Sequence, residues 1–119
     1  MKTIEIPRNE WVPRLNEFTK MYDGWLVSLD VLGPDIGAQP SIANLPLIGV
    51  SADRSTRDRT IYISVARSRA GHFTHIIPGV SHVYLTHVHD GADAAVEIVS
   101  QDGVRTILRC RAPALSKIA

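Results

Sequence analysis

The chain has 119 residues, of which 45% are hydrophobic and 21% are charged, and its formal net charge at pH 7 is +1. This length and composition fit one globular domain and exclude a disordered chain, a collagen-like rod or a coiled coil as the main state. No apolar run approaches the roughly 20 residues that cross a bilayer, so no membrane partner is expected. The near-neutral charge does not require a polyanionic partner.

An amphipathic helix is predicted over about residues 9–23. Four apolar side chains recur at helical spacing and form a single stripe: Trp11, Leu15, Phe18 and Tyr22. Asn9 is a suitable N-cap, and Gly24 can take the left-handed conformation that ends a helix. We expect Trp11 and Trp25 to be largely buried, one from the helix and one from the strand that follows.

Beyond Gly24 the apolar residues recur with the period of two that half-buried strands show. Seven strands are predicted, over about residues 25–32, 47–53, 59–67, 72–77, 80–89, 94–100 and 104–111. The proline-containing segment that ends at Pro46 is predicted as a loop, and residues 1–8 as an extended lead-in. The expected fold is α+β and mainly β, one domain over residues 1–119. Its helix packs on a strongly curved antiparallel sheet, or small open barrel, of six or seven short strands.

The last two predicted strands can pair in two registers. A three-residue loop over residues 101–103 sets Val96 opposite Leu108 and builds a continuous apolar face, whereas a two-residue turn sets Val96 opposite Arg109. Register follows the buried face, so the three-residue loop is favoured, with Gly103 at the position that turns with positive φ.

Charge is distributed in blocks along the chain. Residues 25–53 hold three acids and no base, and residues 54–69 hold five arginines and one acid. Residues 70–104 hold four acids and no Lys or Arg, and residues 105–119 hold four bases and no acid. A folded sheet either brings these blocks together as complementary rows or separates them into patches.

A candidate nucleic-acid surface follows from the last predicted strand. Arg105, Arg109 and Arg111 stripe its outer face, and Tyr62 is a candidate stacking platform. Small barrels bind single-stranded nucleic acid with such a basic surface and exposed aromatics. The alternative is a solvated sheet face on which these arginines pair with Glu97 and the acidic strands. Only 6% of the residues are aromatic, and this scarcity favours the solvated face.

A candidate metal site is the pair His87 and His89. Residues i and i+2 of a strand share a face, so both imidazoles can approach one zinc, copper or iron ion. His72 and His75 offer a third ligand, but no spacing fixes one. The favoured interpretation is therefore a pair of polar side chains at a strand end.

Motifs for other chemistry do not occur: the sequence has no phosphate-binding loop, dinucleotide fingerprint or nucleophile elbow. Cys110, the single cysteine, falls on a predicted apolar face and permits no internal disulfide. We therefore predict no catalytic residue and no cofactor, and expect a cytoplasmic binding or interaction module rather than an enzyme. The alternatives are a nucleic-acid binder that uses the arginines and a metal-binding protein or metal-dependent enzyme that uses His87 and His89. The exposed edges of an incompletely closed sheet favour self-association, with a homodimer as the first expectation and another protein as an alternative partner.

Six short segments occur in the order that is typical of one bacterial family: Asn9–Pro13, Gly24–Val27, Gly37–Gln39, Leu45–Leu47, Ser51–Asp53 and Gly91–Asp93. They resemble a family of small bacterial proteins catalogued as a domain of unknown function, fifty-three thirty-five, and the resemblance extends from residue 5 to about residue 113. The resemblance implies a bacterial, cytoplasmic, single-domain protein. It implies no activity, substrate or catalytic residue.

Overall fold

The structure is a computed structural model that describes residues 2–34, 37–54, 59–67, 71–87 and 94–112. A 3-10 turn, η1 (Arg8–Glu10), precedes the helix α1 (Trp11–Tyr22). The strands are β1 (Lys2–Glu5), β2 (Leu26–Gly33), β3 (Gly37–Ala52), β4 (Ile61–Ala66), β5 (His72–Ile77), β6 (Val80–His87), β7 (Ala94–Ser100) and β8 (Arg105–Ala112). The mainly β, α+β class is therefore confirmed. In the described ranges, no helix has the length and hydropathy to cross a membrane.

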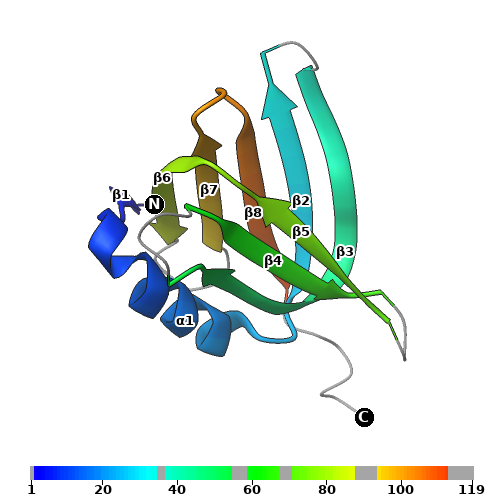
Figure 1. Cartoon of the computed structure of the whole chain (residues 1–119). Coiled ribbons are helices and arrows are strands. Elements are labelled where there is room, and N and C mark those ends of the chain that lie inside the picture. Colours follow the sequence, from blue (N-terminus) through cyan, green and yellow to red (C-terminus); the bar gives the residue numbers. More distant parts are fainter. Residues whose placement is uncertain (1, 35–36, 55–58, 68–70, 88–93, 113–119) are drawn as a thin grey trace.

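The strands form one antiparallel sheet with the order β1-β6-β7-β8-β2-β3-β4-β5. The sheet curves strongly, so that β4 and β5 cross in front of β6, β7 and β8, while α1 lies along the lower end of the layers (Figure 1). Among the described residues β1 and β5 are the two ends of the order and do not pair with each other, so the sheet is open rather than a closed barrel.

The helix begins and ends close to the predicted bounds. All four residues of the apolar stripe are buried, and α1 packs mainly against β3. Gly24 has a φ of 83° and ends the helix as expected. Asn9 is not the N-cap, because η1 extends the first turn and moves the cap to Glu10, which makes no side-chain capping bond.

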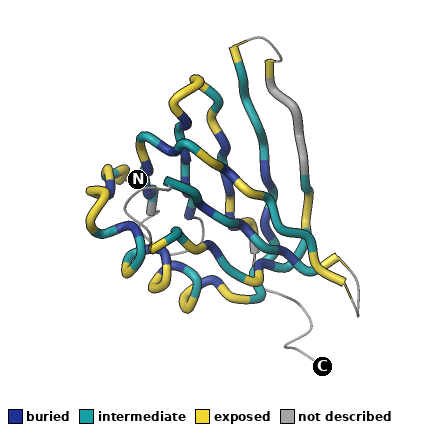
Figure 2. The backbone as a smooth tube through the Cα atoms, viewed as in Figure 1, coloured by how far each residue is buried: buried dark blue, intermediate teal, exposed yellow. Residues whose placement is uncertain are grey.

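The two tryptophans differ in burial. Trp11 is 5% exposed, as predicted. Trp25 is less buried than Trp11, and it packs against the core from its margin. It precedes β2 instead of lying in it, and its ring packs edge-on against Tyr22 with 4.9 Å between ring centroids. Figure 2 shows the buried residues gathered where the layers face each other and the exposed ones at hairpin tips and on the outer face of α1.

Strand β3 is the main departure from the predicted elements. It has 16 residues, and the loop predicted over its first part was wrong, because residues 37–46 pair with β2. Pro40 and Pro46 indicated a loop because proline cannot donate a backbone hydrogen bond. However, β4 pairs with β3 only from Leu47 onward, so in the described structure both prolines border a free edge, where a missing donor costs little.

Strand β1 is additional to the seven predicted strands, because its residues were expected only as an extended lead-in. Its four residues are too few to show a period, and β6 pairs with all of them, from Lys2 opposite His87 to Glu5 opposite Tyr84. The pairing continues beyond the strand, since the Ile6 backbone N–H donates to the Val83 carbonyl oxygen at 2.8 Å.

The register of the last hairpin is confirmed. Val96 lies opposite Leu108 and Ala94 lies opposite Cys110, so the apolar side chains of β7 and β8 share the buried face. The Ser100 backbone N–H donates to the Val104 carbonyl oxygen at 2.9 Å, which closes a three-residue loop.

Gly103 should be the residue of this loop that is least tolerant of change. Its φ is 89°, and an added Cβ would also lie 3.4 Å from Cγ of Pro34. We expect Gly103→Val to lower the free energy of unfolding by about 1–2 kcal/mol, because a side chain is strained in this conformation. The exposed Gln101 should tolerate Gln101→Ala with a change below about 0.5 kcal/mol. Urea denaturation of both variants measures the difference, and equal losses would contradict the assigned turn.

Candidate functional site

The arginine stripe (Arg105, Arg109 and Arg111) lies exposed on the outer face of β8. Nη1 of Arg105 donates to Oε2 of Glu97 at 3.0 Å, and Nη1 of Arg109 donates to Oδ2 of Asp30 at 3.0 Å. β8 lies between β7, which carries Glu97, and β2, which carries Asp30. The acidic and basic blocks therefore meet here as complementary rows, and this pairing favours the solvated face over a nucleic-acid surface.

Tyr62 lies on β4, in the other layer of the sheet. Its flanking residues Ile61 and Ile63 are buried, so Tyr62 is on the outer face, where its hydroxyl donates to Oδ2 of Asp53 at 3.5 Å. Because β4 lies in front of β8, the outer faces of these two strands point away from each other (Figure 1). The structure therefore does not bring Tyr62 together with the arginine stripe.

The candidate metal pair falls only partly within the described chain. His87 is the last residue of β6, its side chain is not described, and His89 lies outside the described residues, so the metal site stays a prediction. His72 and His75 lie on opposite faces of β5 and cannot act as a pair. Within the described ranges, no group of three or more His, Cys, Asp or Glu could hold a metal ion.

Strand β5 is one end of the sheet and has two different faces. Phe73, His75 and Ile77 face inward, and burial lowers the pKa of His75, so its imidazole favours the neutral form. On the outer face Ile76 is 59% exposed and lies opposite Tyr62 of β4. The edge that β5 turns away from β4 has no strand beside it in the described structure.

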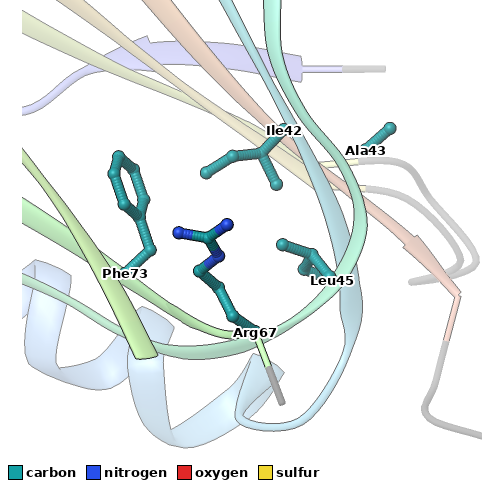
Figure 3. A pocket seen from close by; sticks show the side chains of 5 residues that line it. All are labelled: Ile42, Ala43, Leu45, Arg67 and Phe73. Atoms are coloured by element: carbon teal, nitrogen blue, oxygen red, sulfur yellow. The ribbon is translucent and has the colours of Figure 1, made fainter. Parts of the chain in front are cut away.

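A pocket of about 340 Å³ opens between β3 and the start of β5. It is lined by Ile42, Ala43, Leu45, Arg67 and Phe73. Figure 3 shows the guanidinium of Arg67, the residue after β4, pointing into the space between the Phe73 ring and the two larger β3 side chains. The sequence does not reveal this pocket, because its β3 wall has the prolines of a loop and Arg67 is one of five arginines in residues 54–69.

A bulge in β3 shapes one wall of the pocket. Val27 pairs with Leu45 and Leu29 pairs with Ile42, so β3 has two residues where β2 has one. One of the two is Asn44, whose φ of 58° is in the left-handed region that asparagine tolerates better than most residues. Bulges bend a strand and redirect its side chains, and they are common beside binding sites.

Comparisons with known proteins support the resemblance seen in the sequence. The model of a family of unknown function, DUF5335, matches residues 2–117. An uncharacterized protein of Aquifex aeolicus (strain VF5) is 29% identical over 111 residues, which cover 93% of this chain and 94% of the relative. No solved structure matches the chain. Since the family model extends from β1 to beyond β8, the chain belongs to this family of unknown function.

Proposed function

We propose that the protein is an interaction module that forms a homodimer by pairing of two β5 strands across a two-fold axis. The observation that carries this proposal is the difference between β5 and the other free edges of the sheet. All six residues of β5 pair with β4, so every second residue directs its backbone N–H and C=O groups toward the open side. Such an edge accepts another strand.

The other free edges carry features that hinder strand addition. β1 has only four residues, among them Lys2 and Glu5, and Oε2 of Glu5 is hydrogen-bonded to Nδ1 of His82 at 2.7 Å. The free edge of β3 contains Pro40, Pro46 and the bulge at Asn44. Short length, charge, proline and bulges are the devices that protect edges.

β5, with the sequence HFTHII, has none of these devices. A two-fold axis uses the same surface on both chains, which an antiparallel pair of identical strands satisfies. The exposed Ile76 and its neighbour Tyr62 would add apolar contact beside the backbone hydrogen bonds. A cytoplasmic location completes the proposal, in keeping with a sequence that has a single cysteine, the buried Cys110.

Ile76→Lys should weaken this dimer, because it replaces the apolar contact of Ile76 with a charge and lysine on an edge strand hinders pairing. We expect the dissociation constant of the dimer to rise about tenfold or more, as measured by sedimentation velocity over a range of protein concentrations. Met21→Lys is the matched control, since Met21 is 63% exposed on α1, which packs mainly against β3. A wild-type chain that stays monomeric throughout, or equal effects of both variants, would contradict the proposal.

A further inference from the structure

Among the described residues that line the pocket between β3 and β5, Arg67 is the one that carries a charge. In the described parts of the chain no carboxylate lies within ion-pair distance of its guanidinium, whereas Arg14, Arg105 and Arg109 each have one. Its backbone is held in place, because the Arg67 N–H donates to the Gly71 carbonyl oxygen at 3.1 Å. The side chain of Arg67 is exposed, and its guanidinium points into the pocket, so its hydrogen-bond donors are available to a ligand there (Figure 3).

The apolar walls of the pocket are extensions of the core. Ile42, Leu45 and Phe73 are partly buried and packed against the buried cluster, so their positions are fixed on one side and uncovered on the other. The bulge that contains Asn44 lies between Ile42 and Leu45, the two larger β3 side chains of the pocket. A fixed apolar surface with one convergent polar group is the usual form of a small-molecule site.

We propose that this pocket binds a small organic monocarboxylate, with its carboxylate on Arg67 and its aromatic or branched apolar body against Ile42, Leu45 and Phe73. A guanidinium pairs with a carboxylate through two parallel N–H···O hydrogen bonds, which fixes the orientation of the ligand. The volume of about 340 Å³ is at the small end of the range for ligand sites, which favours a ligand of one or two rings. Inorganic phosphate would gain nothing from the apolar walls, and a neutral hydrocarbon would gain nothing from Arg67.

Titration of the full chain with 2-naphthoate, followed by its fluorescence and by calorimetry, tests this site. We expect saturable binding with one ligand per chain. Arg67→Gln should raise the dissociation constant at least about tenfold, because a charge-assisted pair is lost. The neutral amide of the same ring system should bind the wild-type chain correspondingly weakly, and inorganic phosphate should not compete.

Arg111→Gln is the charge-matched control. This variant should bind 2-naphthoate as the wild type does, because Arg111 is exposed on the outer face of β8. Ile76→Lys should also leave the affinity unchanged, because Ile76 faces outward while Phe73 faces the pocket. The outcome for ligand binding is thus separable from the outcome for dimerisation. Equal affinity of Arg67→Gln and the wild type, or no saturable binding of 2-naphthoate, would overturn the proposed site.

Discussion

Replacing Trp11 by alanine should lower the free energy of unfolding by about 3–5 kcal/mol, the usual loss for a buried tryptophan. The side chain is 5% exposed at the start of α1. Its Nε1–H donates to the Ile6 carbonyl oxygen at 3.0 Å, in a buried hydrogen bond that ties the helix to the segment after β1. The substitution removes the apolar contacts of the indole and leaves that carbonyl oxygen without its donor.

Urea denaturation followed by circular dichroism measures this loss. Trp11→Phe separates its two causes, since phenylalanine keeps most of the apolar volume but cannot donate to Ile6, and we expect it to cost about 1–3 kcal/mol. Trp25→Ala should cost less than Trp11→Ala, because Trp25 is only partly buried. A loss below about 1 kcal/mol for Trp11→Ala would be incompatible with a core built around this side chain.

Thr19→Val should have the second largest effect, because one hydroxyl joins the helix to the backbone of the sheet. Oγ1 of Thr19 donates to the Val50 carbonyl oxygen at 2.9 Å and accepts from the Val50 backbone N–H at 2.9 Å. Val50 lies beyond Pro46, where β2 stops pairing with β3, so the threonine hydroxyl takes the place of a neighbouring strand. Gly49 permits this approach, since a Cβ there would lie 3.1 Å from Cγ2 of Thr19.

Valine has nearly the shape of threonine but leaves both backbone groups of Val50 without partners. Each such group costs about 1–3 kcal/mol, and because the site is only partly buried we expect a total loss of about 2–4 kcal/mol. Thr19→Ser keeps the hydroxyl and removes one methyl group, so it should cost about 1 kcal/mol. Thermal and urea unfolding of the two variants measure the difference, and equal losses would show that the hydroxyl does not join helix and sheet.

Local patterns in the sequence were enough for the helix, most strands and the last hairpin. The predicted strands over residues 72–77 and 94–100 coincide with β5 and β7. The register of β7 on β8 followed from keeping Val96 and Leu108 on one face. These features depend on periods and turns within short segments, where each residue constrains its neighbours.

Features that depend on distant strands could not be predicted in this way. Pro40 and Pro46 are acceptable in β3 only because its other side is free there, and this depends on where β4 begins to pair. The partner of Arg109 is Asp30, 79 residues away, because β8 lies beside β2. The pocket likewise needs a bulge, the end of β4 and the start of β5 to meet.

Backbone amide hydrogen exchange in β5, measured as the protein is diluted, tests self-association most directly. If two copies pair through β5, the amides between His72 and Ile77 that do not bond to β4 should exchange slowly in concentrated protein. Their protection should fall on dilution and in Ile76→Lys, while the exchange of β1 stays constant. Exchange in β5 that is independent of concentration, or concentration-dependent protection of β1 in its place, would contradict pairing through the β5 edge.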